Sequence, residues 1–537
     1  MSSRYASLIT ATALAGLVIV RAFPFVWWSG THFDSDQAIV GLMAKHISEA
    51  RAFPLYYYGQ NYMLAVEAWL AAPVMALTSP SVTALKLPLV AINVAVVLLL
   101  LRLLVREAGL AAGIAAIAAL PLALPAAGMA ARTTEANGGN VEPFLYVLLL
   151  WMARARPCLF GIVLGVGVLH REFTAYGAAA LLVMDCLGLM GGSGEGRAAW
   201  RARLLDKSSR WAVAGVAFLC VRGVAAAVRP FANGLGPGTR GDDPALVATV
   251  VDTLGGRICV DPATWPERAS LLVFDHLPRL VGGTPAPLAD YGVLTGVYSG
   301  LPGLGPWVAA ITAVGVLAGA WHWLTVARVQ PDSVLPIPGG APATPVARTL
   351  APDTGERPAD TRRSPPVTSH LGSYLILVGL ISTLVYGFLT CSSIRVETMR
   401  YNLLGLFIPV GALVMALQAW RAPAARAGLG AAVVLWCALN TSDVMALTRE
   451  RATRPPVDRR QALADLLEAR GVTVAWARFR NSYHVTFLSA ERVRVSANDF
   501  IRVQAYADEA RRAGAPTLSE EPCEAGEALL PGLFLCR

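Results

Sequence analysis

Long apolar runs, separated by short breaks rich in arginine, glycine and proline, dominate the chain. Several runs approach or exceed the roughly 20 residues that a helix needs to cross the hydrocarbon core of a membrane. The pattern predicts an all-α polytopic membrane protein with about eleven transmembrane helices. We expect these helices near residues 6–28, 84–105, 109–131, 142–154, 157–170, 173–191, 211–229, 304–327, 373–391, 402–420 and 426–446.

Polar stretches divide the sequence into a membrane domain at 1–446 and a tail at 447–537. Residues 29–80 form a first loop after the first helix, and 230–303 form a longer loop. Both loops are expected on the outer face. Residues 329–371 are rich in Pro, Thr, Ala and Gly without apolar periodicity, so we expect a disordered cytoplasmic linker there.

The tail regains the polarity of a water-exposed domain. Residues 459–471 carry apolar side chains at helical spacing, and 500–513 are typical of a second helix. Runs at 472–477 and 493–496 are typical of short strands. The tail is therefore predicted to be a small α/β domain.

The composition agrees with a membrane protein. Of 537 residues, 55% are hydrophobic and only 15% are charged, whereas soluble globular proteins carry about 25% charged residues. Eight cysteines form no CxxC pair and no metal-binding pattern with histidine. Cys523 and Cys536 lie together in the tail and can pair if it faces an oxidising compartment.

The formal net charge is +9. A basic chain can bind nucleic acid, but here the arginines gather in short loops, as the positive-inside rule requires. We therefore expect no nucleic-acid partner. The rule places the N-terminus in the cytoplasm, and the predicted crossings place the tail outside a bacterial plasma (inner) membrane. The inner loops are marked by Arg102, Arg106, Arg154, Arg156, Arg197, Arg201, Arg203, Lys207, Arg210, Arg421 and Arg426.

Two aspartates, Asp34 and Asp36, follow the first predicted helix at the outer surface. Apolar residues within 39–47 then recur at helical intervals, which predicts an amphipathic helix lying along the interface. One aspartate can cap that helix. A cap needs only one acid, so the pair also suggests catalysis. The same carboxylates can instead hold Mg²⁺ or Mn²⁺, although we expect no cofactor to be required.

Aromatic and amide side chains in the first loop are candidates for substrate binding. Tyrosines near a membrane are usually interface anchors, but beside amides they can also form a wall on which a sugar stacks. An acid among apolar neighbours is usually paired or functional. The candidates in this loop are Tyr58, Gln60, Asn61, Tyr62 and Glu67.

Further polar residues fall at or near the predicted outer ends of later helices. Arginine presents a planar fork that suits a lipid phosphate. A surface turn, interface anchoring or snorkelling explains the same residues without a ligand, and both interpretations stay open. The candidates are Glu135, Asn137, His170, Arg171, Glu172, Arg222, Arg400 and Tyr401.

The motifs of the first loop resemble those of the GT-C membrane glycosyltransferases. Asp-x-Asp-Gln-Ala at 34–38 is followed by the amphipathic helix, Pro-x-Tyr-x-Tyr-Gly-Gln at 54–60 and Glu-x-Trp at 67–69. The pattern is most similar to the branch of protein mannosyltransferases, lipid A aminoarabinose transferases and bacterial RgtA/B/C/D-like enzymes. The resemblance covers about residues 6–190 and the helix count.

This resemblance implies a catalytic aspartate in the first loop, and Asp36 is the matching position. Family members commonly have Glu next, where this chain has Gln37, so Asp34 is the available second acid. Many relatives also have an Arg-Tyr pair in a late loop that contacts lipid phosphate. Arg400 and Tyr401 match that pair.

The sequence therefore predicts an enzyme that moves a sugar from a polyprenyl-phosphate donor, held in membrane lipid, to a glycan, lipid or protein hydroxyl. An aspartate would act as general base, with inversion at the sugar. One alternative is a transporter or flippase of a lipid-linked or small polar substrate, which predicts related halves with interrupted helices. Another is a polysaccharide polymerase or ligase that uses lipid-diphosphate donors.

Overall fold

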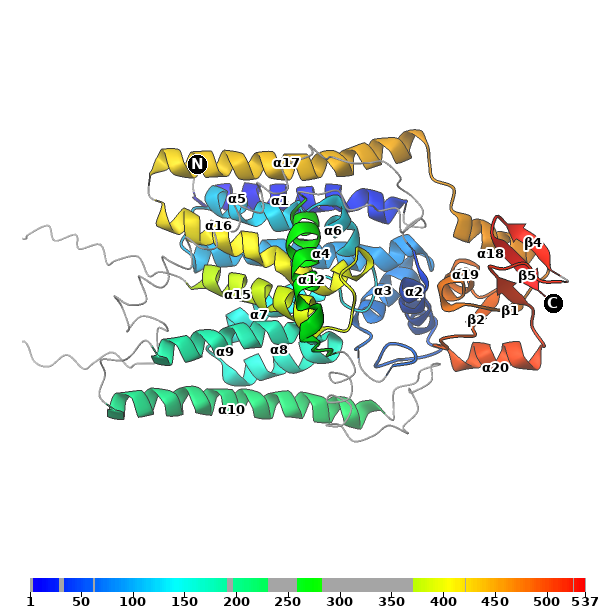
Figure 1. Ribbon diagram of the computed structural model, residues 1–537, viewed down its shortest axis with the longest axis horizontal. Coiled ribbons are helices and arrows are strands. Elements are labelled where there is room, and N and C mark those ends of the chain that lie inside the picture. Colours follow the sequence, from blue (N-terminus) through cyan, green and yellow to red (C-terminus); the bar gives the residue numbers. More distant parts are fainter. Residues whose placement is uncertain are drawn as a thin grey trace, which may run out of the picture.

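The computed structural model describes residues 3–28, 33–60, 63–190, 197–229, 258–282, 370–420, 422–524 and 526–536. Most long helices run side by side along one axis, and a small C-terminal domain lies beyond one end of the bundle (Figure 1). The N-terminus lies toward the opposite end (Figure 1). The helices α2 and α3 lie between the bundle and the C-terminal domain (Figure 1).

Within the described residues, seven helices are long and apolar enough to cross a membrane. A helix satisfies its backbone hydrogen bonds internally, which lipid requires. The chain is therefore an α-helical integral membrane protein, as predicted. The candidate spans are Tyr5–Trp27, Val82–Arg106, Glu172–Leu189, Ala198–Val228, Leu371–Leu389, Glu397–Ala419 and Pro423–Thr453.

The membrane part contains both these spans and shorter helices. In chain order the helices are α1 (Ser3–Trp27), α2 (Ser35–Ser48), α3 (Val66–Leu77), α4 (Val82–Arg106), α5 (Ala112–Ala123), α6 (Ala127–Arg132), α7 (Glu142–Ala153), α8 (Pro157–His170), α9 (Ala175–Met190), α10 (Arg197–Val228), α12 (Trp265–Leu271), α13 (Leu277–Val281), α15 (Leu371–Leu384), α16 (Phe407–Ala419) and α17 (Pro423–Thr453). Short 3-10 or π segments are η2 (Glu172–Thr174), η4 (Pro262–Thr264), η5 (Leu272–His276), η7 (Val385–Leu389) and η8 (Glu397–Leu406).

Several observed helices differ from the predicted ones. The predicted helix at 109–131 is broken into α5 and α6, with Pro125 between them; proline cannot donate the backbone hydrogen bond that would continue a helix. Helices α10 and α17 extend well beyond the predicted 211–229 and 426–446, because they continue into polar sequence. Helix α3 was not predicted as a helix.

Some predictions lie outside the described residues. These are the helix at 304–327, nearly all of the linker at 329–371, and the parts of the long loop at 230–257 and 283–303.

The predicted first-loop helix is α2, and Asp34 is its N-cap. The Asp34 carboxylate accepts a hydrogen bond from the backbone N–H of Gln37 at 2.9 Å. Almost the whole of α2 is buried, including its polar residues Lys45 and His46. Its polar face is buried because the C-terminal domain covers it, so α2 lies inside the molecule.

The C-terminal domain contains a five-stranded mixed sheet in the order β2-β1-β3-β5-β4. Strand β1 pairs in parallel with β2 and β3, whereas β5 pairs antiparallel with β3 and β4. The predicted helices and strands correspond to α18, β1, β2 and α20; α19, η9 and β3 to β5 were not predicted. The elements are α18 (Arg459–Ala469), β1 (Val474–Ala477), η9 (Phe479–Asn481), α19 (Tyr483–Leu488), β2 (Arg494–Ala497), α20 (Gln504–Arg512), β3 (Thr517–Ser519), β4 (Glu527–Leu530) and β5 (Leu533–Cys536).

Two disulfides are present. Cys523 pairs with Cys536, which confirms the pairing that the sequence left open. The second bond joins Cys259 to Cys391 and was not predicted. Next to it, Ile258 forms a short β-bridge with Thr390, so the segment before α12 is held against the turn that leads to η8.

The C-terminal domain is fixed to the first loop through Glu491. Its carboxylate accepts hydrogen bonds from Lys45 Nζ at 2.5 Å and Tyr506 Oη at 2.6 Å, and pairs with Arg51. His46 Nε2 lies 3.2 Å away. Burial alone would raise the pKa of Glu491, but the hydrogen bonds from His46, Lys45 and Tyr506 outweigh it and hold that pKa well below its usual range.

Helix α19 packs directly on α2 beside this ionic contact. Gly41 permits the close approach, because a Cβ atom there would lie 2.7 Å from the Phe487 ring. Within the membrane part, the buried Arg451 near the end of α17 donates to the Pro24 carbonyl of α1 at 2.9 Å, which anchors the helix that leads to the C-terminal domain. The membrane part and the C-terminal domain therefore form one packed body.

Candidate active site

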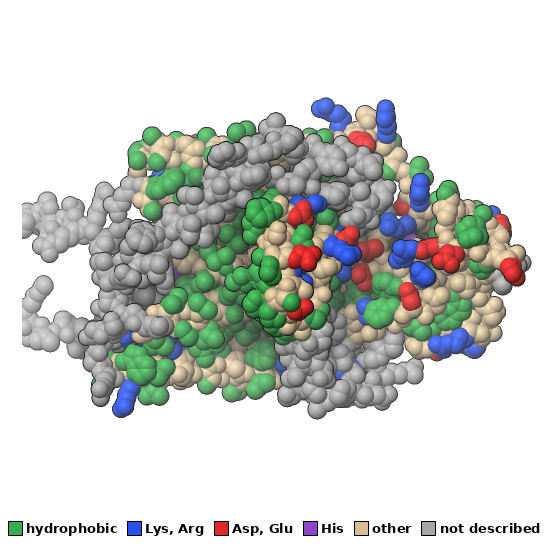
Figure 2. All heavy atoms as spheres, viewed as in Figure 1, with side chains coloured by type: hydrophobic (Ala, Val, Ile, Leu, Met, Phe, Trp, Pro, Cys, Tyr) green, Lys and Arg blue, Asp and Glu red, His purple; other side chains and the backbone are tan. Residues whose placement is uncertain are grey.

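A pocket of about 900 Å³ lies where the membrane part meets the C-terminal domain. On the face that Figure 2 shows, acidic and basic side chains gather at this junction and along the segment that contains α12, while hydrophobic side chains cover much of the other described surface of the bundle. The polar residues that line the pocket from the membrane part are Asp34, Ser35, Asp36, Arg132, Glu397 and Arg400. Its polar lining from the C-terminal domain is Arg459, Arg460, Arg480, Asn481, His484 and Glu520.

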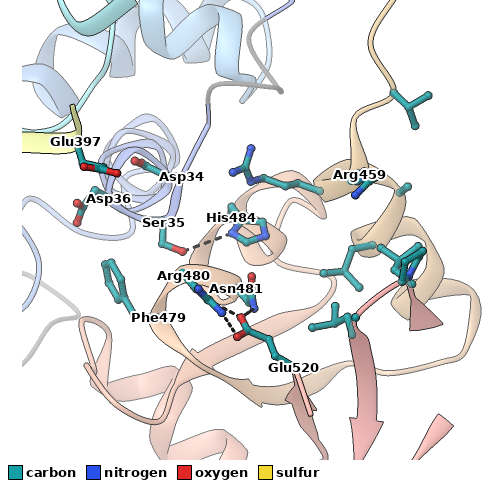
Figure 3. A pocket seen from close by; sticks show the side chains of 18 of the residues that line it. Asp34, Ser35, Asp36, Glu397, Arg459, Phe479, Arg480, Asn481, His484 and Glu520 are labelled. Atoms are coloured by element: carbon teal, nitrogen blue, oxygen red, sulfur yellow. Dashed lines mark hydrogen bonds and ion pairs between the residues drawn. The ribbon is translucent and has the colours of Figure 1, made fainter. Parts of the chain in front are cut away.

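Asp36 lies in the first turn of α2 and faces the pocket (Figure 3). Its Oδ2 atom lies 3.6 Å from Nη1 of Arg400, and its side chain keeps 30% of its exposure. Burial, followed by the charge of Asp34, raises the pKa of Asp36, while Arg400, Arg502 and Arg171 oppose the rise. An accessible carboxylate with a raised pKa, held beside arginines, is suited to accept a proton.

The backbone around Asp36 is fixed from two sides. Tyr57 donates its hydroxyl to the Asp36 carbonyl at 2.7 Å. Ser35 Oγ lies 3.5 Å from Nδ1 of His484, which belongs to α19 (Figure 3). Burial lowers the pKa of His484 to about 3, so this ring is neutral near pH 7.

Glu135 and Asn137 lie next to the pocket in the loop between α6 and α7. Arg132, which lines the pocket, donates to Glu135 at 3.1 and 3.3 Å, and Asn137 donates to the same carboxylate at 3.1 Å. Burial raises the pKa of Glu135 to about 7 against the opposing charge of Arg132. Glu135, together with Asn137, therefore holds Arg132 in place in the wall of the pocket.

Glu67 and Arg171 lie behind Asp36. Glu67 is buried and accepts backbone N–H groups from Gly138 at 2.6 Å and Gly139 at 2.8 Å. Both glycines have positive φ angles, a backbone conformation that residues other than glycine rarely adopt. Arg171 is also buried, and its Nη1 lies 2.9 Å from the Met63 sulfur. Glu67 thus shapes the second loop, and Arg171 contributes positive charge near Asp36.

Tyr58 and Gln60 contact other groups of the junction. The Tyr58 side chain is fully buried and its hydroxyl lies 2.9 Å from His46 Nδ1. The Gln60 amide oxygen, in the orientation that satisfies both groups, accepts from Arg502 at 2.8 and 2.9 Å. Gln60 therefore connects the first loop to the C-terminal domain, whereas Tyr58 binds α2 within the first loop. The remaining two candidates of this loop, Asn61 and Tyr62, lie outside the described residues.

Tyr401 lies beside Arg400, whose guanidinium is 5.3 Å from the centre of the tyrosine ring. His170 is buried, with Nδ1 3.1 Å from the Tyr146 hydroxyl. Glu172 is half-buried in η2, close enough to Tyr176 for its charge to act on that phenol. These three side chains do not line the pocket.

Arg222 is separate from the pocket. It lies on α10, with its guanidinium 6.0 Å from the centre of the Phe218 ring. It does not line the pocket with Asp36. The structure therefore brings Asp34, Asp36 and Arg400 together and leaves Arg222 elsewhere.

Sequence reasoning missed the whole contribution of the C-terminal domain and also Glu397. Arg480 and Asn481 both bond to the Glu520 carboxylate on the far wall (Figure 3). These residues carry no motif, and only the packing of α19 on α2 brings them near Asp36. Within the described residues, no group of three or more His, Cys, Asp or Glu side chains is arranged to hold a metal ion.

No protein-family model matches the chain, and the search of curated proteins gives no match. Similar folds occur among solved structures. One is the archaeal oligosaccharyltransferase AglB from Archaeoglobus fulgidus, in complex with an inhibitory peptide and a dolichol-phosphate: 13% identity, TM-score 0.48, 96% of this chain and 69% of that one. An oligosaccharyltransferase structure from the same organism, with Zn and sulfate, has 14% identity and TM-score 0.49 over 92% and 62% of the two chains.

A third similar structure is ArnT from Cupriavidus metallidurans in the apo state, with 12% identity, a TM-score of 0.39 and coverage of 100% and 98%. The first two of these neighbours are oligosaccharyltransferases, and the third is ArnT. Identities and TM-scores this low carry no argument about activity. The function therefore has to be inferred from the site itself.

Proposed function

We propose that this protein is a membrane glycosyltransferase. It moves a sugar from a polyprenyl-phosphate donor to a hydroxyl of a glycan, lipid or protein acceptor on the outer membrane face. One observation carries the proposal: Asp36, a carboxylate of raised pKa, faces a polar pocket at the end of a membrane bundle, 3.6 Å from Arg400. A base and a phosphate-binding cation are the two groups that this transfer needs.

In the proposed step, Asp36 accepts the proton of the acceptor hydroxyl as that oxygen attacks the anomeric carbon. The bond from that carbon to the donor phosphate oxygen breaks, and the polyprenyl phosphate leaves with both electrons. Attack from the face opposite the leaving group inverts the anomeric configuration. General-base assistance of this kind is worth about 10²–10⁴-fold in rate.

Arginine side chains supply the charge that the leaving phosphate requires. Arg400 lines the pocket, and Arg171 lies close enough to act on Asp36. Fixed positive charge in a site shielded from water stabilises a developing anion more effectively than solvent does. The proposal therefore needs no metal ion. Binding of Mg²⁺ or Mn²⁺ by Asp34 and Asp36 is the alternative, and loss of activity on treatment with a chelator would favour it.

The disulfides support an outward-facing site. Cys523–Cys536 lies in the C-terminal domain, and Cys259–Cys391 lies beside the turn that leads to Arg400. Disulfides persist in oxidising compartments and are rare in the cytoplasm. We therefore infer that the pocket and the C-terminal domain face the outside of a bacterial plasma membrane, with the N-terminus in the cytoplasm.

The experiment is a comparison of cell-envelope glycans and glycoproteins by mass spectrometry in a deletion strain. We expect a sugar modification to disappear with the gene and to return with the wild-type chain. The Asp36→Asn variant, produced at the same level and with the same melting temperature, should not restore it. Restoration by that variant would show that Asp36 is not the base.

A further inference from the structure

The wall of the pocket opposite Asp36 has a composition that proton transfer does not explain. It is supplied by the C-terminal domain and contains three arginines, Arg459, Arg460 and Arg480, but only one acid, Glu520. Arg480 and Asn481 both bind the Glu520 carboxylate, so that acid is already neutralised. The remaining excess charge on this wall is positive.

That excess lies in the first turn of α18. The cap residue Asp458 accepts from the backbone N–H groups of Arg460 and Gln461 at 3.0 and 3.1 Å. Its carboxylate therefore caps the helix backbone, and its charge also acts on Arg460. Arg459 is exposed and, within the described residues, has no hydrogen-bond or ion-pair partner. Arg460 is half-buried and close enough to Asp34 for the two charges to interact.

The two sides of the pocket thus differ in sign. The membrane side presents three carboxylates, those of Asp34, Asp36 and Glu397, and two arginines. Of these arginines, Arg132 is engaged by Glu135, and Arg400 lies 3.6 Å from Asp36. A ligand spanning the pocket would meet the three carboxylates and Arg400 at one end and an excess of guanidinium groups at the other. Guanidinium groups select carboxylate or phosphate through paired hydrogen bonds.

We propose that Arg459 and Arg460 form an anion subsite for the acceptor, which is a carbohydrate carrying a carboxylate or phosphate group. This inference rests on the proposed function, because it takes the acceptor hydroxyl to lie at Asp36. The pocket volume of about 900 Å³ is within the range of ligand sites, about 300–1,000 Å³. The amide of Asn481 and the guanidinium groups supply donors for the hydroxyls of such a sugar.

The subsite can be tested without any transfer reaction. Full-length protein in phosphatidylcholine nanodiscs is titrated with tetragalacturonate, which is anionic, with maltotetraose, which is neutral, and with tetraglutamate as an acidic peptide. We expect tetragalacturonate to bind about tenfold more tightly than either other probe, since one charge-assisted contact is worth about that factor. Its affinity should fall as salt is raised.

Variants locate the binding. Arg459→Gln should weaken tetragalacturonate binding severalfold, and Arg459→Gln with Arg460→Gln should weaken it about tenfold or more. A control with the same change in charge, Arg454→Gln with Arg512→Gln, alters exposed arginines that do not line the pocket and should leave binding unchanged. Because Arg459 is exposed, the single variant is expected to fold normally.

Equal binding of the charged and neutral sugars, preference for the peptide, or wild-type affinity in the double variant would each overturn the subsite. Asp36→Asn should retain tetragalacturonate binding while losing transfer. Failure of the general-base proposal would instead appear as restored envelope glycosylation by Asp36→Asn. The two proposals can therefore fail separately.

Discussion

Arg400 Nη1 lies 3.6 Å from the Asp36 carboxylate, although one residue belongs to the first loop and the other to η8, late in the chain. The contact depends on two structural fixtures. Asp36 is held by α2, which the C-terminal domain covers, and Arg400 follows a turn that the Cys259–Cys391 bond restrains. Each fixture can be altered without touching the reacting groups.

The two aspartates of the first loop should respond differently to the same change. Asp36→Asn removes the proposed base, so transfer should fall by about 10²–10⁴-fold. Asp34→Asn should retain most activity, since asparagine caps a helix about as well as aspartate. Single-turnover transfer rates and melting temperatures of both variants check this. Equal loss of activity in the two variants would mean that the carboxylates act as one unit.

The pH dependence of transfer should show a raised carboxylate pKa. Asp36 acts only when ionised, so activity should fall as the pH drops through its pKa, which lies above the ordinary aspartate value of about 3.9. Arg400 lowers that pKa, so Arg400→Gln should move the acid limb to higher pH as well as slow transfer. The measurement is kcat/KM against pH. Arg400→Lys should keep the limb near its wild-type position, and an unmoved limb in Arg400→Gln would contradict the assignment.

Glu491 should stabilise the junction more than an exposed acid does. Glu491→Gln removes the buried carboxylate that Lys45 and Arg51 share and leaves them only the more exposed Glu49, which costs about 1–3 kcal/mol. The control is Glu468→Gln, which breaks an exposed pair with Arg492 worth about 0–1 kcal/mol. Thermal unfolding and limited proteolysis at residues 454–458 measure the difference. Similar stability of the two variants would show that the domain is held by packing alone.

The two disulfides should differ in their effect on activity. Cys259–Cys391 closes a sequence separation of 132 residues and restrains the turn before Arg400. The double variant Cys259→Ser with Cys391→Ser should have a lower melting temperature and a transfer rate that is reduced several-fold. The double variant Cys523→Ser with Cys536→Ser opens a loop with a sequence separation of only 13 residues. This loop is not next to Arg400, so its loss should reduce the transfer rate less. Equal activity of the two double variants would show that the restrained turn does not position Arg400 for transfer.

The sequence located several helices of the bundle well because hydropathy is a local property, although only seven helices of the described residues, and not α7 or α8, are long enough to span a membrane. Helices α1, α4, α7 and α8 lie close to their predicted ranges. Hydropathy detects only the lipid-facing length, so the polar beginning of α10 around Arg201 was missed. Helix α3 was missed because its 12 residues are shorter than a span and include Pro73.

The candidate site was only half visible in the sequence. Asp34 and Asp36 stand out as acids beside an apolar run, and the choice between cap and base is resolved in favour of Asp34 as the cap by one hydrogen bond. The opposite wall of the pocket could not be predicted, because Arg459 and His484 lie in the C-terminal domain and belong to no recognisable sequence motif. Such long-range neighbours arise from tertiary packing, which no local pattern encodes.

Helix α17 has 31 residues, or about 46 Å at about 1.5 Å per residue, and a hydrocarbon core is only about 30 Å thick. It spans the bundle and leads to the C-terminal domain (Figure 1), and only residues 454–458 connect it to α18. The long helix α17 therefore fixes the distance of the C-terminal domain from the lipid, and the short connector restricts movement of that domain relative to the bundle.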